Sequence, residues 1–240
     1  MKAILLAAGL GSRLGNLTSN IPKCLLKVSG ITMLDHWIYK LNALGVTEFL
    51  INTHYLADKV TQHFQNHGLR KAITLVNEPE LLGTAGTILA NSEFITEDTF
   101  VVHADNVCQD NLNGMIKAHI NRPKQCIMTL LTFETAFPKE CGIITKNNKD
   151  IMVGFQEKPS IYISSLANGA VYIVTKDFKN YLKNLGTREY DLSKNVLPNL
   201  LNKVFCYHTT EFFMDIGTIR GLKAAERHIR NLPAKNPKPN

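Results

Sequence analysis

Glycines and two basic residues crowd the start of the chain in a pattern suited to phosphate binding. An apolar run gives way to a loop that carries Gly9, Gly11 and Gly15, and Arg13 and Lys23 add positive charge. Glycines let the backbone approach an anion and present N–H groups to it. The segment therefore predicts a binding site for the phosphates of a nucleotide.

Two well-known phosphate loops fit this segment less well. A dinucleotide fingerprint opens directly into a helix, and an acidic residue ends the next strand. Here Pro22 interrupts such a helix, and the next expected strand ends in Asn52, Thr53 and His54. A Walker A loop needs Gly-Lys-Ser or Gly-Lys-Thr, which this sequence does not contain at the loop. Neither type of site is therefore expected.

An aspartate that follows an expected strand could hold a metal ion beside those phosphates. Asp105 follows an apolar strand, and magnesium binds through one or two carboxylates together with phosphate oxygens. A helix-capping role is the plainer alternative. Asp105 therefore predicts a magnesium ligand, whereas Asp215, in the segment FFMDIGT, is by itself a turn aspartate that caps the following helix.

The apolar periodicity predicts the elements that position these residues. It indicates an α/β fold, with a single-domain, Rossmann-like, mostly parallel sheet flanked by helices over residues 1–231 and a disordered tail over 232–240. Strands are expected at 2–8, 47–53, 72–77, 98–104, 126–132, 169–175 and 203–208, with a two-stranded excursion over 142–157. Helices are expected at 33–44, 56–67, 111–119, 176–184, 191–202 and 218–230. Ligands of such sheets bind beyond the carboxyl ends of the strands, so the glycine loop and Asp105 should face one crevice.

Composition narrows the partners and the compartment. The 240 residues carry 27 Lys and Arg against 20 Asp and Glu, for a net charge of +7. The basic clusters are short and free of interleaved aromatics, which favours small anionic metabolites over nucleic acid. No apolar run reaches membrane-spanning length, and the five cysteines are scattered without a CxxC pair. We therefore expect a cytoplasmic protein without nucleic-acid or membrane partners; homo-oligomer formation is left open.

The N-terminal run GxGxRL…LT…PKxLL resembles the signature of the sugar-1-phosphate nucleotidyltransferases. The resemblance extends to about residue 230 and favours short bacterial members, such as mannose- and heptose-1-phosphate guanylyltransferases. It implies an enzyme that joins a nucleoside triphosphate to a sugar 1-phosphate and releases pyrophosphate, for surface-glycan synthesis. Arg13 and Lys23 would neutralise the phosphates, and Asp105 and Asp215 would hold Mg²⁺ as the other two catalytic residues.

The segment NEPELLGTAGTI, residues 77–88, resembles the part of that family that lies along the base and ribose. Glu78 would accept hydrogen bonds from guanine N1–H and N2–H, which favours GTP. The resemblance as a whole assigns the nucleotide to Leu6, Ala8, Gly9, Gly11, Glu78, Gly83 and Thr84.

The second half of the chain carries the motifs that the family uses for the sugar phosphate. Cys141-Gly142-Ile143, Phe155-Gln156-Glu157-Lys158-Pro159 and Asn168-Gly169-Ala170-Val171-Tyr172 occur in the family's order. The resemblance implies that Glu157 and Asn168 contact sugar hydroxyls, that Lys158 binds the sugar phosphate, and that Gly142 approaches the sugar.

Other readings remain open. One is a uridylyltransferase acting on an N-acetylated sugar 1-phosphate. A second is a cytidylyltransferase acting on phosphocholine, because Ala104-Asp105-Asn106 resembles that branch of the superfamily. A third is a non-catalytic subunit that binds nucleotide sugars, although the complete set of charged residues argues against it.

The remaining candidates have plainer explanations. Trp37 falls on the inner face of its helix and is expected in the core, and Asp191 caps the following helix or helps to position substrate. Seven histidines lack metal-ligand spacing in company with carboxylates and are expected at the surface or behind the site: His54, His63, His67, His103, His119, His208 and His228.

Overall fold

A computed structural model describes residues 1–185 and 191–232. Its strands are β1 (Lys2–Leu6), β2 (Lys27–Val28), β3 (Ile31–Thr32), β4 (Glu48–Thr53), β5 (Ile73–Asn77), β6 (Thr99–His103), β7 (Asn106–Cys108), β8 (Met128–Glu134), β9 (Gly142–Lys146), β10 (Met152–Glu157), β11 (Leu166–Val174), β12 (Val204–His208) and β13 (Phe213–Asp215). Its α-helices are α1 (Met33–Asn42), α2 (Ala57–Phe64), α3 (Gly83–Ala90), α4 (Asn113–Ile120), α5 (Lys176–Leu185) and α6 (Ile219–Arg230). No helix in these ranges is long and apolar enough to cross a membrane.

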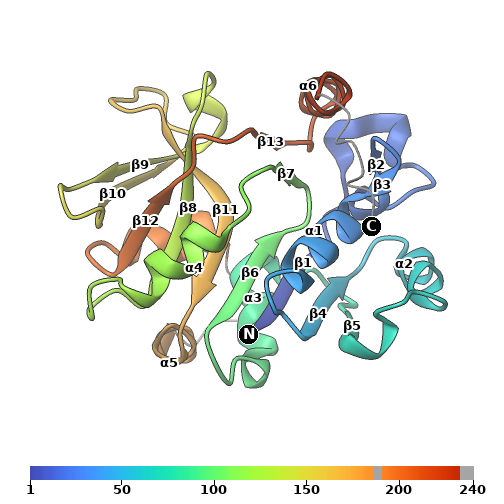
Figure 1. Ribbon diagram of the computed structural model, residues 1–240, viewed down its shortest axis with the longest axis horizontal. Coiled ribbons are helices and arrows are strands. Elements are labelled where there is room, and N and C mark those ends of the chain that lie inside the picture. The colour runs from blue at the N-terminus through green and yellow to red at the C-terminus, as the bar shows by residue number, and fades with distance from the viewer. Residues whose placement is uncertain (186–190, 233–240) are drawn as a thin grey trace, which may run out of the picture.

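One sheet runs through the molecule, in the order β10-β9-β11-β6-β1-β4-β5, with β8 and β12 attached beside β11 (Figure 1). In the first half β1 pairs in parallel with both β4 and β6. Leu6 is level with Asn52 on one side and His103 on the other, so the carboxyl ends of three strands meet at one edge. The expected α/β fold, with parallel central strands, is confirmed.

In the second half of the chain the sheet continues through strands that pair mostly antiparallel. Strand β11 runs antiparallel to β6, β8 and β9, and β9 pairs with β10 across the polar turn that the sequence predicts. The motifs expected for the sugar phosphate lie on these strands. The same sheet therefore places them beside β6, which ends at the expected metal site.

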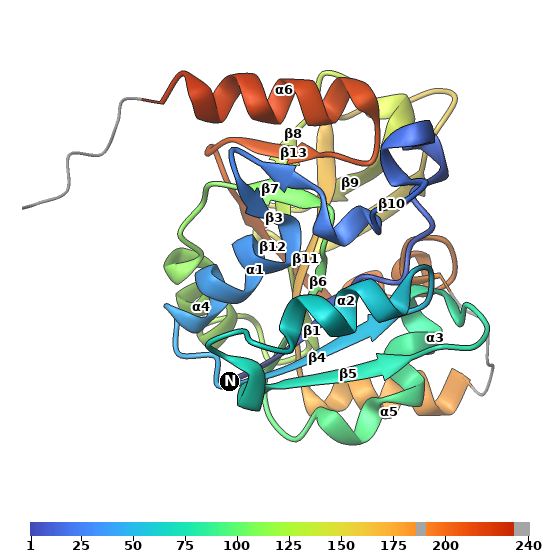
Figure 2. The same ribbon diagram turned by 90° about the vertical axis from the view of Figure 1, so that its right-hand side faces the viewer.

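Helices cover both faces of the sheet (Figures 1 and 2). Alternate residues of a strand point to opposite faces, and β6 shows this directly. Phe100 and Val102 pack with α1, α2 and α4, whereas Val101 packs with α3 and α5. Trp37 of α1 is fully buried, as expected, and its indole N–H donates to the Asn106 carbonyl at 2.9 Å.

A small second sheet is absent from the sequence prediction. Strand β13 pairs antiparallel with β7 and sets Asp215 opposite Asn106. The Ile216 N–H donates to the Asp105 carbonyl at 2.9 Å. Helix α6 then begins after Thr218, whose hydroxyl accepts from the Gly221 N–H and caps the helix. This pairing brings the two aspartates together across more than 100 residues of sequence.

Two expected elements differ from the structure for clear local reasons. Strand β1 ends at Leu6 rather than at residue 8, because the Ala7 N–H donates to the Asn52 side chain instead of to the sheet. The helix expected over 191–202 is a π-helical segment (Leu192–Val196) followed by one 3-10 turn (Leu197–Asn199). Proline lacks an N–H, so Pro198 prevents a continuous α-helical ladder.

The expected tail falls, from residue 233 onward, outside the described residues. The extent of the domain over 1–231 stays a prediction.

Candidate active site

The glycine loop folds back on itself and is closed by a threonine. Gly11 has the left-handed backbone φ of 68° that favours glycine. The Thr18 hydroxyl donates to the carbonyls of Gly11 and Gly15, at 3.0 and 3.2 Å. A Cβ on Gly11 would lie 2.9 Å from Thr18 Cγ2 and 3.2 Å from Lys23 Cβ. Glycine is therefore needed here so that the loop can pack against the base of the Lys23 side chain.

Lys23 is buried and forms a very short ion pair with Asp105. It begins a 3-10 turn (Lys23–Leu25) directly after Pro22, so its backbone is fixed where the loop returns to the sheet. Burial raises the pKa of Asp105, but the positive charge of Lys23 and its hydrogen bond to the carboxylate outweigh burial and lower that pKa below its ordinary value. Asp105 is thus held as a carboxylate.

Asp215 faces the same space from the other side. Its Oδ1 accepts from the Gly217 N–H at 2.5 Å, and its Oδ2 lies 4.0 Å from Arg13 Nη2. Restricted hydration in the site and the neighbouring charge of Asp105 raise the pKa of Asp215. Two carboxylates that repel one another in this way favour the binding of a cation between them.

Gly217 marks the point where these side chains meet. A Cβ on this glycine would lie 2.6 Å from Lys23 Nζ, 2.7 Å from Asp215 Oδ1 and 2.8 Å from Arg13 Nη2. Since Lys23 is paired with Asp105, all four expected catalytic side chains lie around one small space. This space stays open because Gly217 has no side chain.

The donor set fits a divalent metal that also binds substrate. Among the described residues no group of three or more His, Cys, Asp or Glu could hold a metal by itself. Asp105 and Asp215 supply two carboxylates, and magnesium completes such a set with phosphate oxygens and water. The residues present therefore fit a metal ion that is bound together with a nucleotide.

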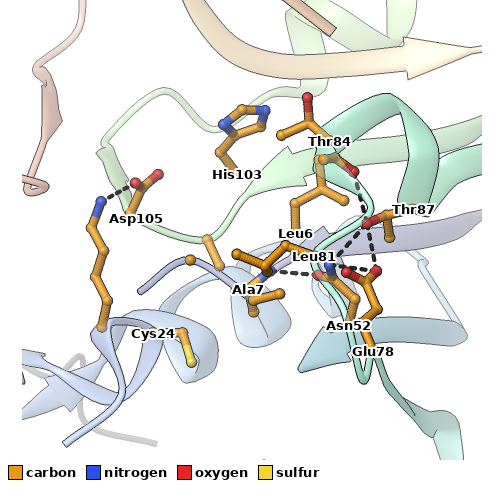
Figure 3. Close-up of a pocket in the computed structure, with 15 residues that line it drawn as sticks. Leu6, Ala7, Cys24, Asn52, Glu78, Leu81, Thr84, Thr87, His103 and Asp105 are labelled. Carbon is orange, nitrogen blue, oxygen red and sulfur yellow. Dashed lines mark hydrogen bonds and ion pairs between the residues drawn. The ribbon is translucent and has the colours of Figure 1, made fainter. Parts of the chain in front are cut away.

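A cavity of about 210 Å³ begins at Lys23 and Asp105 and runs along the carboxyl ends of β1, β4 and β6 (Figure 3). Lys23 and Asp105 line one end, and the start of helix α3 lines the other. Six of the seven residues expected to bind the nucleotide line it: Leu6, Ala8, Gly9, Glu78, Gly83 and Thr84. Gly11 shapes the loop behind it.

The floor of the cavity contains a buried hydrogen-bond network that the sequence did not reveal. Asn52 Oδ1 accepts from the Ala7 N–H at 2.7 Å, where the glycine loop leaves β1. Asn52 Nδ2 donates to Glu78 Oε1 at 3.0 Å and to Thr87 Oγ1 at 3.1 Å. The Thr87 hydroxyl donates to the same Glu78 oxygen at 2.5 Å. The network ties the start of the loop to helix α3.

This network supplies hydrogen-bond donors to the Glu78 carboxylate. Its carboxylate is 3 % exposed and is bound by Asn52 and Thr87, and its second oxygen lies 3.4 Å from the Leu82 N–H. Glu78 therefore accepts mainly from protein donors in this structure, and its contact with guanine stays a prediction. For an acidic residue beside a glycine-rich helix start, the sequence does not show whether a base or the protein donates hydrogen bonds to the carboxylate.

We expect Asn52→Ala to weaken nucleotide binding more than turnover. The change leaves the Ala7 N–H without its acceptor and removes one donor from Glu78. Each unpaired buried group lowers the free energy of unfolding by about 1–3 kcal/mol. Chemical denaturation and the KM for the nucleoside triphosphate measure both effects. Thr53→Val is the matched control, since Thr53 is equally buried but its hydroxyl reaches only the Val76 carbonyl, at 3.5 Å. Equal KM values for the triphosphate in the two variants would contradict a role of Asn52 in nucleotide binding.

The first turn of helix α3 is also tied to the second half of the chain. The Leu192 N–H donates to the Thr84 hydroxyl at 2.7 Å. Asp191, one residue earlier, caps its own turn by accepting from the Lys194 N–H at 2.9 Å. The capping role expected for Asp191 is confirmed.

The residues expected to bind the sugar phosphate gather on β9, β10 and β11. Gly142 pairs with Glu157 in register, and a Cβ on Gly142 would lie 2.9 Å from Glu157 Oε2. Burial raises the pKa of Glu157. Lys158 has a left-handed φ of 48° and donates its N–H to the Cys141 carbonyl, and its ammonium is half exposed. Asn168 donates to the Tyr172 hydroxyl at 2.9 Å. None of these four lines the cavity described above.

Two histidines lie neither at the surface nor behind the site, where they were expected. His119 is 1 % exposed and lies against the Thr129 hydroxyl and Asp98. His103 lines the nucleotide cavity, and burial lowers its pKa although nearby carboxylates oppose this effect. The signal for His103 was present in the sequence, since it ends the same strand that Asp105 follows.

The chain is similar to known proteins over most of its length. A model of the nucleotidyl transferase family matches residues 2–231. A Sulfolobus acidocaldarius protein, provisionally assigned as a mannose-1-phosphate guanyltransferase, is 31 % identical over 226 residues, which cover 92 % of this chain and 60 % of that protein. Mannose-1-phosphate guanyltransferase beta-A of Xenopus laevis is 27 % identical, over 90 % of this chain and 61 % of its own. The chain thus spans about 60 % of the length of these relatives.

Solved structures share the fold. A provisionally assigned glucose-1-phosphate thymidylyltransferase from Bacillus anthracis superposes with a TM-score of 0.85 at 24 % identity, covering 98 % of both chains. HddC from Yersinia pseudotuberculosis, solved in complex with GMP-PN, gives a TM-score of 0.79 at 20 % identity, covering 95 % of this chain and 99 % of its own. With the family model spanning nearly the whole sequence, the chain belongs to the nucleotidyl transferase family.

Proposed function

We propose that the chain transfers a guanylyl group from GTP to a sugar 1-phosphate, forming a GDP-sugar for surface-glycan synthesis and releasing pyrophosphate. The observation that carries the proposal is the meeting of Arg13, Lys23 and Asp215 over Gly217, with Asp105 paired to Lys23. Two carboxylates and two cations beside a nucleotide-sized crevice are what the joining of two phosphates requires. Because the proposed donor is a nucleoside triphosphate, we expect the reaction to take place in the cytoplasm.

The chemistry needs little from the protein beyond position and charge. An oxygen of the sugar phosphate attacks the α-phosphorus, and the bond from that phosphorus to the β-phosphate bridging oxygen breaks as pyrophosphate leaves. The nucleophile is already ionised at neutral pH, so no general base is required. Lys23 and Arg13 offset the charge of the leaving group, and Lys158 holds the attacking phosphate.

Asp105 and Asp215 would hold Mg²⁺ beside the reacting phosphates. When bound, the ion neutralises charge and orients the phosphate oxygens. Without it, Lys23 supplies the positive charge next to Asp105. The pairing in the structure therefore keeps the carboxylate ionised and ready for a metal.

Support for GTP and for mannose 1-phosphate comes from the names of the relatives and not from Glu78. The phosphocholine alternative comes from the motif Ala104-Asp105-Asn106. Asn106 is buried; its amide donates to the Gly169 carbonyl at 3.1 Å, and its own carbonyl accepts from Trp37. These contacts give Asn106 a structural role that needs no particular substrate.

A matrix of the four nucleoside triphosphates against sugar 1-phosphates and phosphocholine tests the function. Each pair is incubated with Mg²⁺, with a chelator as the control, and the products are identified by mass. We expect GDP-sugar and pyrophosphate from GTP with mannose or heptose 1-phosphate. A UDP- or CDP-linked product would replace the guanylyl assignment. No product with any pair, together with tight binding of a nucleotide sugar, would favour the regulatory subunit.

Lys158→Ala should raise the KM for the sugar 1-phosphate and leave the KM for the triphosphate unchanged. A hydrogen bond to a charged group contributes about 1.5–3 kcal/mol, which corresponds to roughly a 10- to 100-fold change in KM. Initial-rate kinetics with each substrate varied in turn measure this. Lys149→Ala, in the exposed turn between β9 and β10, is the control and should behave as the wild type. An unchanged sugar-phosphate KM would remove Lys158 from the substrate site.

A further inference from the structure

The imidazole of His103 lines the cavity described above, between the end at Asp105 and the end at helix α3. In Figure 3 it stands between Asp105, at the metal end, and Thr84, at the end formed by helix α3, and all three residues line the cavity. In a nucleotide the α-phosphate is the group that joins the nucleoside to the outer phosphates. A nucleotide that follows the cavity from Thr84 to Asp105 therefore passes His103 at its α-phosphate.

His103 is also the polar side chain of this site whose hydrogen-bonding capacity is not used. Within the described ranges, its Nε2 is shielded from solvent and has no hydrogen-bond partner. Its neighbours are already engaged, since Lys23 pairs with Asp105 and Thr84 accepts from Leu192. Buried polar atoms normally have a partner, and a neutral imidazole carries one N–H that ring rotation can present to either side. The unmatched nitrogen therefore points to a ligand.

Packing gives the ring a fixed position. Its centroid lies 6.3 Å from that of Tyr172, with the two planes inclined by 59°. Tyr172 is itself fully buried and is held by Asn168. Strand β6 fixes the backbone of His103 level with Leu6, where the glycine loop begins. A donor that is held in place before the ligand arrives is the arrangement that stabilises charge developing in a transition state.

We propose that His103 is a catalytic residue that donates its N–H to a non-bridging oxygen of the α-phosphate. The proposal rests on the proposed function, because only nucleotidyl transfer makes the α-phosphorus the reacting atom. The imidazole transfers no proton, and the bonds formed and broken are those between the α-phosphorus and the two phosphate oxygens. Removal of one such donor lowers kcat by about 10²- to 10³-fold.

The test uses the full chain, the triphosphate that the wild type accepts, and its two α-phosphorothioate diastereomers. Sulfur replaces a different non-bridging oxygen in each diastereomer and is a poor hydrogen-bond acceptor. His103→Phe removes the donor but keeps a ring against Tyr172, and His103→Asn keeps a shorter donor. His36→Phe is the matched control, because His36 also carries a buried, unpartnered Nε2 but does not line the cavity.

We expect His103→Phe to lower kcat about 100-fold, with a smaller loss in His103→Asn and none in His36→Phe. We also expect the wild-type preference between the two diastereomers to shrink at least about tenfold in His103→Phe, because the substituted oxygen no longer loses a donor. An unchanged preference, or a kcat equal to that of the wild type, would overturn the role of His103 and leave only packing against Tyr172. If the Phe variant does not fold, the same ratio in His103→Leu, which also removes the donor, decides. A wild-type enzyme that releases no pyrophosphate would instead refute the proposed function.

Discussion

Asp105→Asn is expected to abolish most of the turnover while the protein remains folded. Asparagine has the same shape and still accepts a hydrogen bond from Lys23, but it removes one of the two negative charges that would hold the metal. Loss even of an outer partner of a metal ligand costs about 10- to 100-fold, so loss of the ligand itself should lower kcat by more than about 100-fold. Pyrophosphate release measures the loss, and circular dichroism and thermal unfolding check the fold.

Asp98→Asn provides the matched control. Asp98 precedes strand β6 and Asp105 follows it, so the two carboxylates lie at opposite ends of one strand. Asp98 lies beside His119, and a hydrogen bond from the His119 side chain lowers the pKa of Asp98. Its substitution should lower the free energy of unfolding at neutral pH, with the difference from the wild type vanishing as the pH falls through the lowered pKa, and should leave kcat unchanged. Near-normal activity of Asp105→Asn in Mg²⁺ would show that the metal assignment is wrong.

Lys23→Met should have the second large effect, and it should act on both catalysis and stability. The substitution removes a cation expected beside the leaving pyrophosphate, which should lower kcat by about 10²- to 10³-fold. It also leaves the Asp105 carboxylate without its ion-pair partner in a partly buried site. Loss of one partner of a buried pair lowers the free energy of unfolding by about 3 kcal/mol.

The added readout for Lys23→Met is thermal unfolding with and without a divalent ion. Since a bound metal would supply the missing positive charge beside Asp105, Mg²⁺ should raise the Tm of the variant more than that of the wild type. Lys146→Met is the control, because Lys146 pairs with Asp150 in a turn away from the cavity. Equal metal-induced changes in Tm for Lys23→Met and the wild type would separate Lys23 from the metal site.

Local patterns were sufficient for most of the fold. The helical spacing of apolar residues in α1 and the polar turn between β9 and β10 each predicted an element that the structure contains. The glycine loop and Lys23 were also readable from the sequence, because phosphate binding demands particular residue types at close spacing. Charge, spacing and the family resemblance therefore predicted a phosphate site, and Gly9 and Lys23 do line one cavity.

Contacts between distant segments could not be predicted in this way. The pairing of β7 with β13 brings Asp215 to Asp105, but strands of three residues leave no periodic signal. Glu78 was expected to face a base, yet its donors Asn52 and Thr87 come from β4 and α3. Which partner satisfies a buried carboxylate depends on tertiary packing, and a single sequence does not record it.

The central claim is that Asp105 and Asp215 share one metal ion above Gly217. Crystals grown with Mn²⁺ and the nucleotide-sugar product, measured at the manganese absorption edge, test it directly. We expect one anomalous peak within coordination distance of both carboxylates and of the diphosphate. We also expect Lys23 to have moved from Asp105 toward the phosphate oxygens. A peak that contacts neither aspartate, with the Lys23–Asp105 pair still intact beside bound product, would contradict it.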